Sequence, residues 1–369
     1  MSEKYEELIE KIGKENYSTI IKMAKMYIRN CPRIMGYSNV FPVSITKSME
    51  YVEDFFKQLN EDYYHRVMNI FHLDVIDDSF ITDVDKEYSI PETFLKNNGY
   101  CFRIMGIKDP EDTREPELPD QELKNICYTQ TGEVRAEETN TIFSALSIVH
   151  ETGHKIADQY FNNIVDECIV AYKEIPGITL EVLFTDYLER KNVSYNEIWA
   201  LREFRRKDVL VACINLLLLD ILLKNYKKNI STTELRNLLF NCVPDLRNIG
   251  FSFNEEEIKH ILNKDIEKIA LYIFNNISYV IGYIMAEYYR KDYYMNPNDP
   301  MIFKFIHIYG DNLMESAEAF QARKELHLPL ENKNFEELEE ILKETIKRDF
   351  FPGGSTDFVA EIRNDKHKM

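Results

Sequence analysis

The segment SIVHETGH, residues 147–154, carries two histidines four residues apart, with a glutamate directly after the first. On a helix, residues four apart share one face, so His150 and His154 can direct two imidazoles at one metal ion, at the spacing that zinc needs. Glu151 is rotated by about 100° from His150. It therefore lies beside the metal, where a general base can deprotonate a water at the open coordination position. The segment predicts a metal centre with an adjacent base.

Two ordinary helix histidines are the alternative interpretation of this segment. The chain has only eight His, and a chance His-Glu-x-x-His is expected in about one or two such chains in a hundred. The preceding residues, 141–149, are apolar on nearly all sides, which indicates a buried helix where unpaired polar side chains are costly. Gly153 costs about 1 kcal/mol relative to Ala inside a helix, which indicates close approach of another element. These features favour the metal interpretation.

A catalytic zinc site requires a third protein ligand. We expect Glu174, because the twenty residues that separate it from His154 allow one helix to end and another to return. Glu167 and Glu181 are the alternatives for this ligand. Asp158, one turn after His154, and Glu181, two turns after Glu174, better suit partners that orient a ligand imidazole from behind. The expected ligands of one Zn²⁺ per chain are His150, His154 and Glu174.

Helical periodicity dominates the rest of the chain. A helix that begins near Asn140 or Thr141 should run through the HETGH segment, and Pro176 should lie in the first turn of the next one. Two strand-like runs, 99–107 and 125–130, flank an acidic, proline-containing loop at 109–122. Further helices are expected at 3–30, 45–70, 177–190, 195–227, 232–241, 254–267, 269–291 and 334–348. The sequence thus divides into an N-terminal helical region (1–98), a catalytic region (99–350) and a tail (351–369).

Composition limits the classes of partner. The chain is 44% hydrophobic, enough for a core, and its net charge is −18, so nucleic acid and anionic membrane surfaces, which attract clustered Lys and Arg, are not expected partners. The most apolar stretch, 209–223, is short for a bilayer and is interrupted by Asn215 and Asp220, which indicates a core helix. The six scattered cysteines form no Cys-x-x-Cys pair, and the amino terminus has no apolar signal. We therefore expect free thiols and a cytoplasmic location.

HETGH followed by EIPGITLE, residues 174–181, resembles the zinc metallopeptidases of the thimet oligopeptidase and oligoendopeptidase F family. SYVIGYIMAEYY, residues 278–289, is similar to the Tyr- and Gly-containing helix of that family, and residues 310–344 are similar to its closing segment. The chain departs from the family at Ala157, where a further His is frequent, and it is much shorter. The resemblance implies a mainly α, zincin-like metallopeptidase domain with a small antiparallel β-sheet next to the HExxH helix.

The activity that the resemblance implies is hydrolysis of peptide bonds in unstructured peptides, by a zinc-bound water that Glu151 activates. An extended substrate would pair with an edge strand, for which 125–130 is the candidate. The resemblance also implies that a tyrosine hydroxyl stabilises the oxyanion. Tyr279 and Tyr283, four apart on one helical face, both remain candidates. Two other functions stay open: a peptide-binding or scaffold protein with a structural zinc, and a zinc hydrolase of a non-peptide amide.

Overall fold

Helices make up most of the part of the chain that the structure describes, so the predicted mainly α fold is confirmed. The computed structural model describes residues 3–31, 51–52, 54–55, 58, 101–105, 127–128, 133–137, 145–147, 149–151, 153–154, 167–193, 195–225, 230–248, 255–296, 300–302, 305, 326, 328–330 and 334–350. Besides the HETGH segment, its helices are α1 (Glu3–Ile12), α2 (Lys14–Asn30), α7 (Glu174–Arg190), α8 (Tyr195–Asn225), α9 (Thr232–Cys242), α10 (Glu255–Leu262), α11 (Ile266–Met295) and α14 (Phe335–Phe350), with short 3₁₀ helices at η4 (Glu167–Tyr172) and η5 (Pro244–Asn248).

The first predicted helix is in fact two helices, α1 and α2, separated by Gly13. Its φ of 87° lies in the left-handed region, which glycine adopts without a Cβ clash. Two hydrogen bonds then attach α2 to α8: the Tyr17 hydroxyl donates to Asp220 Oδ1, and the Tyr27 hydroxyl donates to the Arg206 carbonyl oxygen, each at 2.8 Å. Hydrophobic side chains of α1 and α2 are also buried in one cluster with those of α7, α8 and α11. The N-terminal helices therefore belong to the same core.

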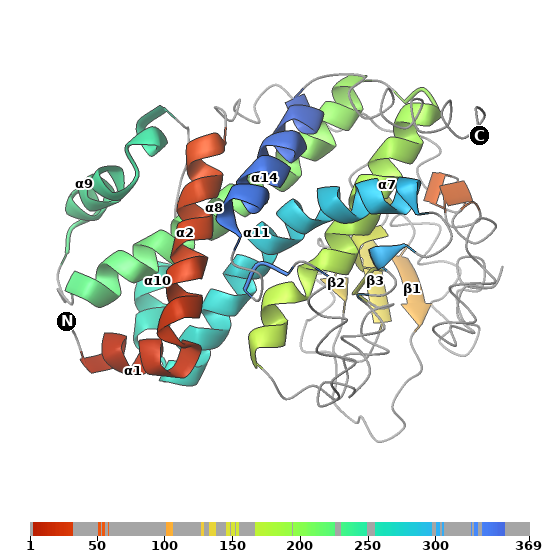
Figure 1. The fold of residues 1–369 in the computed structure, drawn as a ribbon. Coiled ribbons are helices and arrows are strands. Elements are labelled where there is room, and N and C mark those ends of the chain that lie inside the picture. Colours follow the sequence, from red (N-terminus) through yellow and green to blue (C-terminus); the bar gives the residue numbers. More distant parts are fainter. Residues whose placement is uncertain are drawn as a thin grey trace.

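The helix α7 is buried along almost its whole length, from Glu174 to Leu188. A helix that is buried all round needs neighbours on every side. Among the described elements, α7 packs most extensively against α11, which crosses the middle of the molecule in Figure 1. Pro176 lies in the first turn of α7, where its missing N–H costs no intrahelical hydrogen bond.

Among the described residues, α11 is the one helix long and apolar enough to cross a membrane by length and composition. However, 72% of its apolar window is buried inside the protein. Its N-terminus is capped by Asp265, whose Oδ1 accepts a hydrogen bond from the Lys268 backbone N–H at 2.9 Å. The burial indicates that α11 is the central core helix.

A three-stranded antiparallel sheet has the order β1–β3–β2, which places β2 at an edge. The strands are β1 (Cys101–Met105), β2 (Cys127–Tyr128) and β3 (Glu133–Glu137). The central strand β3 was not predicted, because EVRAE offers only Val134 and Ala136 as apolar residues, which pair with Ile104 and Phe102. Figure 1 shows the strands below α7. The loop at 109–122, the tail and most of 45–70 lie outside the described residues.

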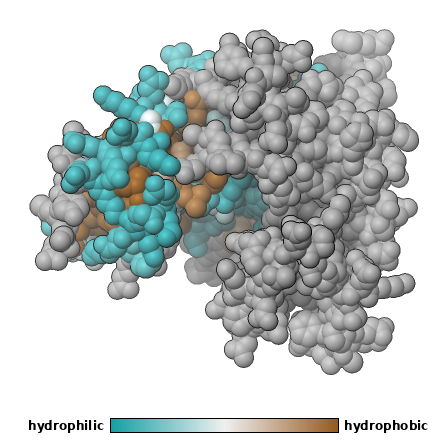
Figure 2. Space-filling view, turned by 90° about the horizontal axis from the view of Figure 1, so that it is seen from below, coloured by the Kyte–Doolittle hydropathy of each residue, from teal (hydrophilic) through white to brown (hydrophobic). Residues whose placement is uncertain are grey.

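The face drawn in Figure 2 is mostly hydrophilic where it is described, with small hydrophobic areas between polar residues. Only two large hydrophobic side chains of the described residues are exposed, Leu271 and Met295. Of the cysteines whose side chains are described, Cys31, Cys213 and Cys242 are free thiols. The described surface therefore has no large apolar area that would need a partner.

Candidate metal centre

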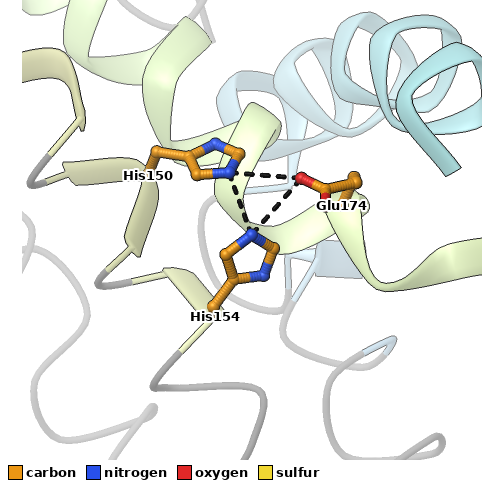
Figure 3. A group of neighbouring side chains, drawn as sticks. All are labelled: His150, His154 and Glu174. Carbon is orange, nitrogen blue, oxygen red and sulfur yellow. Dashed lines mark hydrogen bonds and ion pairs between the residues drawn. The ribbon is translucent and has the colours of Figure 1, made fainter. Parts of the chain in front are cut away.

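Three side chains from two helices converge on one point. The helical HETGH segment turns His150 and His154 toward Glu174, in the first turn of α7 (Figure 3). The two imidazole Nε2 atoms are 2.9 Å apart, and Glu174 Oε2 is 3.2 Å from the His150 Nε2 and 3.3 Å from the His154 Nε2. Two ligands at about 2.0 Å from a tetrahedral metal ion are about 3.3 Å apart. These three donors thus have the mutual spacing of ligands to one metal ion, and no other such group occurs among the described residues.

The environment of Glu174 also fits a metal ligand. Its Oε2 is buried, with the imidazoles of His150 and His154 as its polar neighbours, while Oε1 is 3.7 Å from Lys173 Nζ. Burial alone would raise the pKa of Glu174, but the imidazoles of His154 and His150 hold that pKa well below its usual range. The carboxylate is therefore ionised. Without metal, this buried oxygen depends on a proton carried by an imidazole, and a metal ion would take the place of that proton.

Glycines allow the helices that carry these three donors to approach this closely. A Cβ on Gly153 would lie 2.7 Å from backbone atoms of Gly177, and a Cβ on Gly177 would lie 2.8 Å from the imidazole of His150. The close approach that Gly153 indicated is therefore confirmed, and the approaching element is α7. On the other side of α7, a Cβ on Gly282 of α11 would lie 3.1 Å from the Cβ of Glu174.

Behind His150, the structure places Glu181, whose Oε1 is 2.7 Å from the His150 Nδ1. Burial alone would lower the pKa of His150, but the charge of Glu181 and the hydrogen bonds of Glu174 and Glu181 raise it to about 10. Without metal, His150 is thus a cation between two carboxylates. A metal ion would replace the proton at Nε2, because ligand imidazoles are neutral, while the bond from Nδ1–H to Glu181 fixes the ring.

Arg205, which was not predicted, contacts both Glu181 and His150 from α8. Its Nε donates to Glu181 Oε2 at 2.8 Å, its Nη2 donates to Glu181 Oε1, and the same Nη2 is 3.5 Å from His150 Nδ1. A signal existed, because Arg202, Arg205 and Arg206 lie in a helix that is otherwise largely apolar. Buried guanidinium groups require carboxylate partners, so these arginines indicated that a cluster of buried charged side chains lies beside this helix.

The structure separates the two candidate tyrosines. Tyr279 is half-buried, and the charge of Glu174 followed by burial raises the pKa of its hydroxyl, with a smaller contribution from Glu151. Tyr279 therefore lies within electrostatic reach of both carboxylates and keeps its proton. Tyr283 is instead buried in the core, edge-on to Tyr27 with ring centroids 5.6 Å apart. Glu151 itself is half-buried on the HETGH helix.

Two other candidates lie outside the description. Asp158 is not among the described residues, nor is the side chain of Glu167. Of the described carboxylates, Glu174 is the one placed beside both histidines.

Comparisons with protein-family models, with curated proteins and with solved structures found no match to this chain. The case for a function consequently depends on the metal centre.

Proposed function

We propose that this chain is a zinc-dependent endopeptidase or oligopeptidase that hydrolyses peptide bonds in unstructured peptides. The observation that carries the proposal is the convergence of His150, His154 and Glu174, with donor atoms 2.9–3.3 Å apart, on an HExxH segment. Two imidazoles and one carboxylate are a donor set of catalytic zinc sites, in which three protein ligands leave one position open. A structural zinc site would normally be closed by a fourth protein ligand.

The residues around the donors have the chemistry that peptide hydrolysis needs. Zinc, when bound, would supply Lewis acidity that activates water and polarises the scissile carbonyl. Glu151 accepts a proton from the attacking water and later donates it to the leaving amine nitrogen. The Tyr279 hydroxyl donates a hydrogen bond to the carbonyl oxygen as it becomes negative in the tetrahedral intermediate. The raised pKa of Tyr279 supports this role, because the hydroxyl must retain its proton to donate.

The sheet and the charge of the chain support a peptide as the substrate. In the proposed zincin-like domain, the sheet would lie next to the HETGH helix, and an extended peptide would add to β2, one of the two edge strands. That mode needs several residues in extended form, which favours unstructured peptides. The net charge of −18 disfavours nucleic acid as a partner, and the free thiols of Cys31, Cys213 and Cys242 favour a reducing, cytoplasmic location.

The test is to incubate the zinc-loaded chain with a mixed peptide library and to identify products by mass. We expect internal cleavage by the wild type. Glu151→Gln should keep full zinc occupancy and lose cleavage by about 10²–10⁴-fold, because the amide preserves shape but cannot take the proton. Near-normal cleavage by Glu151→Gln would remove the assigned base. A zinc-loaded wild type that cleaves no peptide would favour the scaffold, or a hydrolase of a non-peptide amide.

A further inference from the structure

We infer that Arg205 is a positioning residue of the metal centre, which holds Glu181 against His150 and thereby orients the His150 ring toward the metal. The inference rests on the proposed function, since it assumes that His150 is a zinc ligand. It concerns a residue in α8, a helix that supplies none of the three donors.

The contact between Arg205 and Glu181 has two points of attachment. Nε and Nη2 of the guanidinium donate to the two different oxygens of the carboxylate. Such a fork fixes the plane of the carboxylate as well as its position. Because Glu181 Oε1 is in turn 2.7 Å from His150 Nδ1, the orientation of the guanidinium is transmitted to the ring.

The same contacts select the tautomer of His150. The Nδ1 atom has two neighbours, Glu181 Oε1 at 2.7 Å and Arg205 Nη2 at 3.5 Å. An ionised carboxylate only accepts hydrogen bonds and a guanidinium only donates them. The shorter contact therefore keeps the proton on Nδ1, which leaves the Nε2 lone pair for the metal. The ring also lies against Gly177, where an added Cβ would come within 2.8 Å of its Cε1 and Nδ1.

A second arginine shows what a purely structural role would look like. Arg202 also joins α8 to α7, through Glu189, with Nη2 and Oε1 2.7 Å apart and both side chains largely buried. If Arg205 served only to hold the two helices together, these arginines would be equivalent. The contact with His150 distinguishes Arg205, and Arg202→Met is accordingly the matched control.

The sign of the effect separates positioning from simple electrostatics. Arg205 is a cation close to a site for a dication, so the loss of its charge alone would strengthen zinc binding. If Arg205 positions Glu181, its loss should instead weaken zinc binding, because a Glu181 side chain that is no longer held does not fix the His150 ring. Arg205→Lys keeps the charge and loses the fork, so it should also bind zinc more weakly than the wild type.

The experiment is zinc affinity of the full chain, measured by chelator competition, with circular dichroism as a check on folding. Arg205→Met and Glu181→Gln should each weaken zinc binding by about 10–100-fold. If Arg205 acts through Glu181, the double variant should bind no more weakly than Glu181→Gln alone. Arg202→Met should keep the wild-type zinc affinity even if it lowers the unfolding temperature.

Unchanged or tighter zinc binding by Arg205→Met, or additive losses in the double variant, would overturn the inference. If Arg205→Met does not fold, Arg205→Lys carries the same test, and wild-type affinity in that variant is the contrary result. A wild type that binds no zinc would overturn the proposed function and this inference together. A wild type that binds zinc, with Arg205 variants unaffected, would overturn this inference alone.

Discussion

The two ends of α7 hold their buried carboxylates in different ways. Toward the C-terminal end, Asp186 Oδ2 accepts a hydrogen bond from Arg290 Nε at 2.5 Å, and Glu189 Oε1 is 2.7 Å from Arg202 Nη2. At the N-terminal end, the Oε2 of Glu174 faces two imidazoles and no guanidinium. The C-terminal end of α7 therefore carries carboxylates paired with guanidinium groups, and we call it the closed end. The N-terminal end carries a carboxylate oxygen beside two imidazoles, and we call it the open end.

The difference shows how a buried acidic residue can be kept for structure or for chemistry. A guanidinium has only donors and is always charged, so Arg290 neutralises Asp186 permanently and cannot itself become a metal ligand, although Asp186 Oδ1 has no hydrogen-bond partner. An imidazole can lose its proton and become a ligand. Glu181 stands between these cases, because Arg205 contacts both of its oxygens and His150 contacts one of them.

The largest expected effect is at the open end. Glu174→Ala removes one of three donors, so we expect zinc affinity to fall by more than about 100-fold, beyond the range seen for residues behind the ligands. Chelator competition on the folded variant measures this. Glu167→Ala and Glu181→Ala are the comparisons, and equal losses in all three would mean that Glu174 is not the third ligand.

The closed end should respond in the opposite way. Asp186→Asn keeps the volume but removes one of two carboxylate partners of the buried Arg290, whose Nη1 still donates to Glu287 Oε1 at 3.1 Å, so the loss of unfolding free energy should be smaller than the about 3–5 kcal/mol that a wholly unpaired buried charge costs. Zinc affinity of the folded variant should stay at the wild-type value. Urea unfolding and chelator competition on the same preparation measure both. Loss of zinc binding without loss of stability would show that the two ends of α7 are not independent.

The sequence predicted the open end better than the closed end, for a physical reason. The spacing of His150 and His154 is local, and Glu174 follows them within one helix–turn–helix. Arg205 could not be placed, because it reaches Glu181 through the packing of α8 against α7. A helix buried on all sides, as α7 is, has no apolar stripe that would show which of its faces meets which neighbour.

The fold shows the same division between local and long-range information. Most helices after residue 173 were predicted to within a few residues of their ends, because apolar periodicity and caps such as Asp265 are local signals, but the predicted helix 254–267 is too long, since α10 ends at Leu262 and α11 begins at Ile266. The break at Gly13 was missed, although glycine in a helix interior is a known weak point. The strand β3 was missed because its pairing with β1 and β2, rather than its own composition, makes it a strand.

A prediction on α11 separates substrate contacts from metal contacts at the open end. Tyr279→Phe removes the proposed oxyanion donor and should lower kcat by about 10²–10³-fold, with zinc affinity unchanged. Tyr283→Phe is the matched control one turn away, in the core against Tyr27, and should leave kcat unchanged. Steady-state kinetics on one cleavable peptide would decide. Equal losses in both variants would remove the assignment to Tyr279.

The smallest expected effect concerns the glycines that bring the open end together. A Cβ on Gly177 would meet His150 Cε1 and Nδ1 at 2.8 Å, and the ring cannot yield freely because Glu181 holds its Nδ1. A Cβ on Gly153 would meet only backbone atoms of α7, at 2.7–2.8 Å, so the helices themselves must separate. Over-packing of this kind costs about 1–3 kcal/mol of unfolding free energy.

We expect both Gly177→Ala and Gly153→Ala to lose stability within that range, with the larger loss for Gly153→Ala, because backbone yields less than a side chain. Zinc affinity should distinguish them further. Gly177→Ala displaces a ligand ring directly, so its folded form should bind zinc about 10-fold more weakly, comparable to loss of a residue behind the ligand. Unfolding free energies of the metal-free proteins and chelator competition give both quantities. Wild-type zinc affinity in Gly177→Ala would mean that the His150 ring is not confined between α7 and Glu181, and that the open end of α7 is more adaptable than its contacts indicate.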